Sequence, residues 1–321
     1  PRYQGAGSSL MNPTQLDNLY DEMVKLVGDE NLTYVPGYDA AGDVVDNALL
    51  EEAKTVVADA DIVVICAGLT DMYEVEGLDR EHMNLPPAHD ALIAAVASAH
   101  KNVVVVLSNG SPVAMPWVND VSAILEGHLG GQAGAGAIAD VLYGKVNPSG
   151  KLAETFPIQL ADNPSYHYFP GGPSTVEYRE SIYVGYRYYD TVEQDVLFPF
   201  GFGLSYTNFE YSQLHLNQEA MADTDTLTVT FNVKNTGSVA GKEIVQLYVR
   251  DVASSTFRPD KELKGFAKVA LAPGTETTVT LELSRRAFAF YSAAAHDWVV
   301  ETGTFEILIG ASSRDIRLQS T

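Results

Sequence analysis

The sequence predicts an α/β sandwich, with a mostly parallel sheet and helices on both faces, followed by an all-β sandwich. In the first half, apolar runs of strand length alternate with segments of helical period, which is the pattern of a parallel sheet covered by helices. From about residue 208, short strand-like runs are separated by turn signals. A chain of 321 residues, of which 46% are hydrophobic and 19% charged, is long and apolar enough for two or three such domains.

The first half contains two kinds of predicted element. Helical spacing covers residues 14–27, 45–58, 87–99 and 133–142. Strands are predicted at 32–35, 62–67, 103–107 and 122–125, and the second and third of these are apolar throughout, as strands covered on both faces should be. We therefore place the α/β sandwich at residues 1–160.

The second half changes character after Gly150. Residues 161–207 are rich in Tyr, Pro and Gly and form a predicted connecting segment, in which we expect Tyr183, Tyr186, Tyr188 and Tyr189 to pack rather than to stack on sugars. Strands are predicted at 226–234, 243–250, 276–283 and 304–310. Residues 208–321 are thus predicted to be a β-sandwich of the size usual for immunoglobulin-like domains.

Composition excludes several classes of protein. A formal charge of −22 argues against nucleic acid or an anionic membrane as partner, and no apolar run is long enough to span a bilayer. The seven histidines lack metal-ligand spacing, so we expect no metal. The single cysteine, Cys66, is predicted to fill the core, and this sparse cysteine usage favours the cytoplasm slightly over secretion. The chain opens on Pro1 with neither initiator methionine nor signal peptide, which we interpret as a piece of a longer protein.

Acidic side chains crowd the segment that follows the 62–67 strand. Glu74, Glu76, Asp79 and Glu81 lie within eight positions, with Arg80 among them. A solvated loop that precedes the next helix is one interpretation. The other is a general acid/base carboxylate, because open α/β sheets keep their sites at the carboxyl ends of strands and neighbouring charges can raise the pKa of one carboxyl.

A glycine-rich stretch over residues 127–139 offers a different function. Gly134, Gly136 and Ala139 match the loose dinucleotide fingerprint, with Glu154 as the later acidic residue. The match is weak because the stretch follows the third clear strand of the domain rather than the first. Close packing of a helix on the sheet is the favoured use of these glycines, and we expect no cofactor.

Several motifs follow one another along the chain. They are Glu76-Gly77-Leu78-Asp79-Arg80, Met83-Asn84-Leu85-Pro86, Asn109-Gly110-Ser111-Pro112-Val113, residues 139–152, Tyr183-Val184-Gly185-Tyr186-Arg187-Tyr188-Tyr189, residues 198–206 and Lys261-Glu262-Leu263-Lys264-Gly265-Phe266. Together these motifs resemble glycoside hydrolase family 3, in particular its β-glucosidases. The resemblance implies the last two domains of such an enzyme, an α/β sandwich and a fibronectin type III-like domain, without the (β/α)₈ barrel that precedes them.

The resemblance also implies a mechanism and site residues. Such enzymes are retaining, with an aspartate nucleophile on the barrel and a glutamate acid/base on a loop of the α/β sandwich. That glutamate corresponds to Glu76, with Glu74 as runner-up, and Asp79, Arg80 and Tyr73 are expected to bind substrate or support the acid/base. An ion pair between Asp79 and Arg80 would orient Glu76 or only shape the loop. The nucleophile is expected outside this chain, and Asp297, in His296-Asp297-Trp298, is not expected to replace it.

The sequence therefore predicts part of a retaining exo-acting β-glycosidase, most simply a β-glucosidase, that is inactive without its barrel. The expected partners are a barrel-bearing chain or segment and a β-glucoside or oligosaccharide. Two other functions stay open: a non-catalytic carbohydrate-binding or scaffold subunit with the same fold, and a nucleotide-binding α/β protein.

Overall fold

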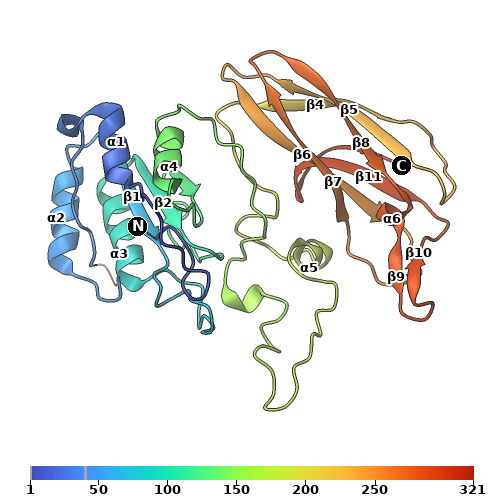
Figure 1. The fold of residues 1–321 in the computed structure, drawn as a ribbon, viewed down its shortest axis with the longest axis horizontal. Helices are drawn as coiled ribbons and strands as arrows, with labels where there is room; N and C mark the ends of the chain where they lie inside the picture. The colour runs from blue at the N-terminus through green and yellow to red at the C-terminus, as the bar shows by residue number, and fades with distance from the viewer. Residues whose placement is uncertain (1, 40–41) are drawn as a thin grey trace. The chain divides into compact units, whose positions relative to one another are not determined.

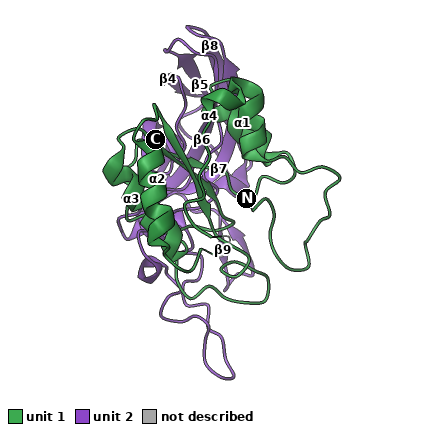
Figure 2. Cartoon of the chain, turned by 90° about the vertical axis from the view of Figure 1, so that its left-hand side faces the viewer, with its two compact units in different colours: residues 1–146 green, residues 147–321 purple. Residues whose placement is uncertain are grey.

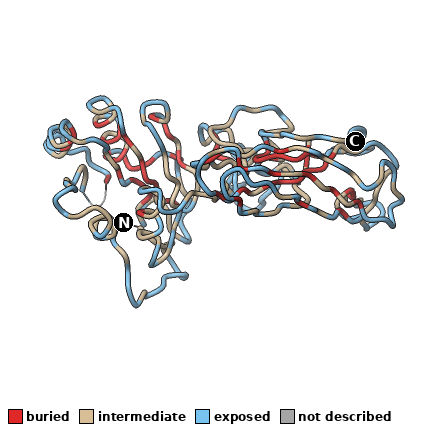
Figure 3. Tube along the Cα trace, turned by 90° about the horizontal axis from the view of Figure 1, so that it is seen from above, coloured by how far each residue is buried: buried red, intermediate tan, exposed pale blue. Residues whose placement is uncertain are grey.

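The computed structural model describes residues 2–39 and 42–321 and divides the chain into two compact units, residues 1–146 and 147–321 (Figure 2). Pro1, on which the interpretation as a piece of a longer protein partly depends, lies outside the described residues. Figure 3 shows that the buried positions gather in the strands of each unit. The predicted domain bounds at 160 and 207 stay predictions, because compact units are defined by contacts and not by independent folding.

The first unit contains a parallel sheet in the order β1-β2-β3, formed by Val63–Gly68, Val103–Ser108 and Ala123–Glu126. Val63 pairs with Val103, and Val104 pairs with Ala123. The central strand is the most apolar, and Val103, Val105 and Leu107 are fully buried. The predicted parallel sheet is thus confirmed, with strand bounds shifted by about one residue.

Helices cover both faces of this sheet. α2 (Asn47–Val57) packs on α3 (Pro87–Ala99), which contacts β1 and β2, while α1 (Leu19–Val27) packs on α4 (Gly134–Leu142) on the other side (Figures 1 and 2). The side chains of Asn18 and Asp46 cap the first turns of α1 and α2 by accepting backbone N–H bonds. These caps explain why α1 and α2 begin later than the apolar spacing predicts. A 3₁₀ turn over Asp29–Asn31 follows α1.

Two predictions of secondary structure and burial in the first unit are wrong. Residues 32–35 form no strand, and Tyr34 is 70% exposed, because this apolar segment has no neighbouring strand to pair with in the part of the chain that the structure describes. Cys66 is exposed rather than a core residue. It lies on β1, an outer strand of the sheet, where an alternate side chain can stay outside the core.

The second unit is an antiparallel sandwich. One sheet has the order β12-β11-β6-β7 and the other β4-β5-β8, with a separate β9-β10 hairpin (Figure 1). The strands are β4 (Phe209–Leu216), β5 (Leu227–Asn235), β6 (Gly241–Asp251), β7 (Glu262–Leu271), β8 (Glu276–Leu283), β9 (Phe290–Ser292), β10 (Asp297–Val299), β11 (Phe305–Ser312) and β12 (Asp315–Ser320). Inward-facing side chains such as Val229, Phe231, Val245, Leu247 and Ile309 form its core.

The segment before the sandwich packs against it through α5 (Tyr186–Thr191). Tyr186 and Tyr189 are buried, and the Tyr186 hydroxyl accepts the Leu263 N–H at 2.8 Å. The tyrosines that stand out in the sequence thus include two packing residues. Two short helical turns complete the unit, Leu160–Asp162 and α6 (Arg285–Phe288).

A buried ion cluster joins the strands of the larger sheet. Arg258 donates to Asp251 at 3.1 Å and to Glu262 at 2.8 Å, and the Asp251 and Arg258 side chains are 4% and 6% exposed. Buried charges are tolerated because they are paired and hydrogen-bonded. Asp297, by contrast, lies exposed on the β9-β10 hairpin, where its carboxylate accepts the N–H of Trp298.

Candidate active site

The acidic loop lies where the sequence places it, between the carboxyl end of β1 and the start of α3 (Figure 1). Two other segments meet it there. One is the turn after β2, which contains Gly110 and Ser111, and the other is the amino-terminal segment, whose Ala6 carbonyl accepts the Glu76 N–H at 3.1 Å. The site is thus built at the carboxyl edge of the parallel sheet, from three parts of the chain.

Glu74 is held on several sides. Its carboxylate accepts hydrogen bonds from the Arg2 guanidinium at 2.7 Å, the Gly110 N–H at 2.8 Å and the Ser111 hydroxyl. Arg2 also donates to the Glu74 carbonyl at 2.7 Å. The Glu74 side chain is only 19% exposed, so this carboxylate joins three segments and has little freedom to reach a substrate.

Glu76 is different. Its side chain is exposed, and its carboxylate accepts from the N–H of Ser8 at 2.7 Å and from the Ser8 hydroxyl. These two donors hold the pKa of the Glu76 carboxyl below its usual value, the hydroxyl contributing most. The sequence suggested that neighbouring charges could raise the pKa of one carboxyl in this loop. For Glu76 the pKa is lowered instead, because the Ser8 hydrogen bonds outweigh the opposing effect of desolvation.

Gly7 lets the amino-terminal segment pass close to Glu76. Its φ of +115° is one that residues with a Cβ rarely adopt. A Cβ built on Gly7 would also lie 2.5 Å from the Glu76 Cβ. Only glycine fits at this position without displacing the loop.

Arg80, which was expected to support Glu76, instead binds the turn after β2. Arg80 donates from Nη1 to the Ser111 hydroxyl at 2.8 Å and to the Pro112 carbonyl at 2.9 Å, and Asp79 is exposed. Between these two described residues no ion pair forms, so the predicted pair is wrong. Burial lowers the pKa of Arg80, and the Glu74 charge opposes that shift. Arg80 thus braces the turn that also holds Glu74.

Tyr73 contacts residues other than the carboxylates of the acidic loop. Its hydroxyl donates to the Asp43 carboxylate at 2.7 Å, and its ring lies 5.8 Å from that of His82. Burial and the Asp43 bond raise the pKa of Tyr73 to about 12. Tyr73 is therefore a neutral donor, and a role in substrate binding stays a prediction.

Sequence reasoning missed three residues of this region. Arg2 and Ser8 are far from the loop in sequence, and only the fold brings them to it. The third is His89, which is 3% exposed and accepts the Gly68 N–H at 3.3 Å. Burial lowers the pKa of His89 to about 4, so its imidazole is neutral near pH 7.

The glycine-rich stretch packs closely at some of its positions, whereas Gly131 and Gly134 have open space beside them. A Cβ on Gly127 would lie 3.0 Å from the Leu107 carbonyl, and one on Gly136 would lie 3.3 Å from the Asp17 carboxylate. An acidic side chain this near the first turn of α4 would repel a pyrophosphate. Glu154 is not on a strand, since residues 152–157 contribute only an isolated bridge from Phe156 to Phe198.

The described residues contain no group of three or more His, Cys, Asp or Glu side chains placed to hold a metal ion. Within the same residues, no helix is both long enough and apolar enough to cross a membrane.

Comparison with known proteins agrees with this architecture. Residues 1–206 match the glycosyl hydrolase family 3 C-terminal domain, and residues 243–313 match the fibronectin type III-like domain. The chain belongs to glycosyl hydrolase family 3. Its α/β unit and its β-sandwich are the fold that this membership predicts.

Family 3 relatives differ in their named substrates. Thermostable beta-glucosidase B of Acetivibrio thermocellus is 56% identical over 100% of this chain and 43% of its own length. An exo-alpha-(1->6)-L-arabinopyranosidase of Bifidobacterium longum is 43% identical over 98% of this chain and 41% of its own. The chain therefore spans less than half the length of these relatives.

Two family 3 structures show the same fold. The β-glucosidase of Bifidobacterium adolescentis is 42% identical, with a TM-score of 0.95 over 100% of this chain and 47% of that protein. The β-glucosidase 3B of Thermotoga neapolitana, in complex with α-D-glucose, is 33% identical, with a TM-score of 0.87 over 99% of this chain and 48% of that protein.

Proposed function

We propose that this chain forms part of a retaining exo-β-glycosidase, most simply a β-glucosidase, and supplies Glu76 as its general acid/base. The nucleophilic aspartate would come from a barrel in another chain or in a preceding segment. The observation that carries the proposal is the contrast between the two glutamates: Glu74 is fixed by Arg2, Gly110 and Ser111, whereas Glu76 presents an exposed carboxylate at the carboxyl edge of the sheet.

The proposed reaction has two steps. In the first, Glu76 gives its proton to the glycosidic oxygen as the bond to the anomeric carbon breaks, while the aspartate attacks that carbon. In the second, Glu76 takes a proton from water, whose oxygen attacks the anomeric carbon and releases the aspartate. Retaining enzymes hold the two carboxyl groups about 5–5.5 Å apart.

Ser8 suits one half of this cycle. Its two hydrogen bonds favour the ionised form of Glu76, which is the form that accepts a proton from water. The first step needs the protonated form. We propose that the charge of the nearby aspartate raises the Glu76 pKa before the first step, and that this effect ends when the aspartate becomes esterified.

The test compares the chain alone with the chain joined to its barrel. We expect no glycoside hydrolysis by the pure 321-residue chain. Native mass spectrometry followed by denaturation would identify a second polypeptide that carries the barrel. Efficient glycoside hydrolysis by the chain without any barrel would contradict the proposal.

The carbohydrate-binding or scaffold alternative makes the opposite prediction for Glu76. Full activity of a complex containing Glu76→Ala, including activity on substrates with poor leaving groups, would favour it. A thermal shift with a nucleotide and none with glucose would favour the nucleotide-binding alternative.

A further inference from the structure

Residues 165–182 of the second unit form a long loop that extends away from α5, here called the arm (Figure 1). Its backbone is ordered by its own hydrogen bonds. The Phe169 N–H donates to the Ser165 carbonyl, and the Gly172 N–H to the Thr175 carbonyl, both at 2.9 Å. The arm therefore has a defined shape although it contains no helix or strand.

The arm exposes an unusual amount of apolar surface. Tyr166, Phe169, Val176 and Tyr178 are 44%, 59%, 57% and 81% exposed. Single exposed apolar side chains are ordinary, but a cluster on one loop marks a surface that contacts a ligand or partner. The sandwich core does not use these side chains.

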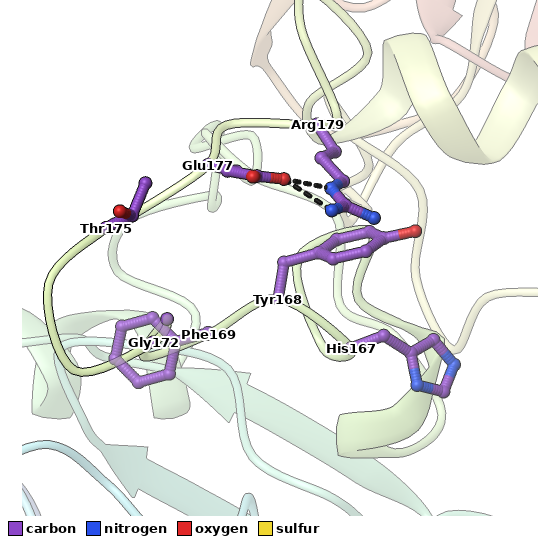
Figure 4. Close-up of a pocket in the computed structure, with 8 residues that line it drawn as sticks. His167, Tyr168, Phe169, Gly172, Thr175, Glu177 and Arg179 are labelled. Atoms are coloured by element: carbon purple, nitrogen blue, oxygen red, sulfur yellow. Dashed lines mark hydrogen bonds and ion pairs between the residues drawn. The ribbon is translucent and has the colours of Figure 1, made fainter.

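Two limbs of the arm border an open cavity of about 330 Å³ (Figure 4). Tyr168, Phe169 and Gly172 lie on one limb, and Thr175, Glu177 and Arg179 lie on the other. A cavity of this size is at the small end of ligand sites and suits about one ring.

The polar groups in the cavity are arranged around the aromatic rings. The Glu177 carboxylate accepts from Nε of Arg179 at 2.5 Å, and the Arg179 guanidinium lies 4.8 Å from the centre of the Tyr168 ring (Figure 4). These contacts place a planar carboxylate and a planar guanidinium beside the Tyr168 ring, while the exposed Phe169 ring lines another part of the same cavity. Because their charges cancel, the cavity has no excess charge with which to attract an ion.

We propose that the cavity of the arm binds one neutral sugar ring. A pyranose has apolar C–H faces and a rim of hydroxyl groups, so it needs an aromatic face together with planar donors and acceptors. Phe169 supplies the exposed face, and Glu177 and Arg179 supply groups that can pair with neighbouring hydroxyls. The choice of a β-glucoside as ligand rests on the proposed function, whereas the site itself does not.

The test is binding of cellobiose to the 321-residue chain, measured by calorimetry and by shifts of backbone amide NMR signals. We expect a dissociation constant of about 1 mM, as for a small ligand that makes few contacts. The shifted signals should come from residues 167–179. Phe169→Ala and Glu177→Gln should each weaken binding about tenfold.

Tyr178→Ala is the matched control, since Tyr178 is aromatic, belongs to the same arm and does not line the cavity. It should leave cellobiose binding unchanged. Absence of binding at 20-fold the expected constant, or an equal loss with the Tyr178 and Phe169 variants, would overturn the proposal. So would a dimer in native mass spectrometry that Phe169→Ala abolishes, because the arm would then contact a second copy of the chain.

Failure here can be told from failure of the proposed function. Hydrolysis by the assembled enzyme reports on Glu76, whereas cellobiose binding by this chain reports only on the arm. Loss of binding without loss of hydrolysis, or the reverse, identifies which of the two proposals is wrong.

Discussion

Replacing Glu74 should destabilise the first unit much more than replacing Glu76. Glu74→Ala removes the acceptor of bonds from Arg2, Gly110 and Ser111. The Arg2 side chain, itself 10% exposed, then keeps one ion pair among the described residues, the one with Asp71. Hydrogen bonds to charged groups contribute about 1.5–3 kcal/mol, and breaking a buried ion pair costs about 3–5 kcal/mol.

The residual exposure of Glu74 reduces these figures. With the side chain 19% exposed, we expect a loss of about 2–4 kcal/mol. If the first unit of 146 residues unfolds as one cooperative body, this corresponds to a fall of roughly 5–15 °C in melting temperature. Glu76→Ala removes an exposed carboxylate and its two bonds from Ser8, so the melting temperature should fall much less than in Glu74→Ala.

Thermal unfolding followed by circular dichroism measures both variants. Hydrogen exchange at the Gly110 amide gives a local readout, because this N–H is bonded to Glu74 and should exchange faster in Glu74→Ala alone. The reasoning would be refuted if Glu76→Ala lowered the melting temperature as much as Glu74→Ala, or if Glu74→Ala changed neither measurement.

Three further predictions follow from the contacts. Gly7→Ala should displace the acidic loop, because its Cβ would lie 2.5 Å from the Glu76 Cβ; unchanged amide NMR signals over the loop would contradict this. Burial lowers the pKa of His89 to about 4, so between pH 6.5 and 4 its imidazole binds a proton in the unfolded chain but not in the folded chain. Stability should therefore fall as pH falls through this window, by about 3 kcal/mol at most, and His89→Gln should flatten the fall; equal slopes in urea unfolding of the two proteins would show otherwise. Arg258→Ala leaves Asp251 buried without its guanidinium partner and should cost about 3–5 kcal/mol in urea unfolding, and a loss below about 1 kcal/mol would contradict the assignment.

The sequence could predict those elements whose burial is uniform or regularly alternating. Val103 to Leu107 is apolar at every position because β2 is the central strand, and β5 alternates because only one face meets the core. Residues 32–35 have the composition of a strand, but no strand lies beside them to pair with among the described residues. Composition alone does not show whether a pairing strand is present. β12 was missed because its residues alternate between exposed and half-buried positions and none is fully buried.

The candidate site could be predicted only in part, for a related reason. The acidic loop is local in sequence and is placed by the strand before it and the helix after it. Its partners Arg2 and Ser8 are separated from Glu74 and Glu76 by 72 and 68 residues, so no spacing rule finds them. The assignment of Glu76 over Glu74 from family resemblance stays a prediction, and the contrast in their hydrogen bonding now gives it a physical basis.

Rescue of Glu76→Ala by azide in the enzyme assembled with its barrel tests the central claim most directly. Without the acid/base, kcat/KM for alkyl glycosides should fall by about 10²–10⁴, with a smaller loss for dinitrophenyl glycosides, whose leaving group needs no proton. Azide should then restore turnover by attacking the glycosyl-enzyme, with a β-glycosyl azide as product. Full activity of Glu76→Ala on alkyl glycosides, or azide rescue of Glu74→Ala in its place, would contradict the account.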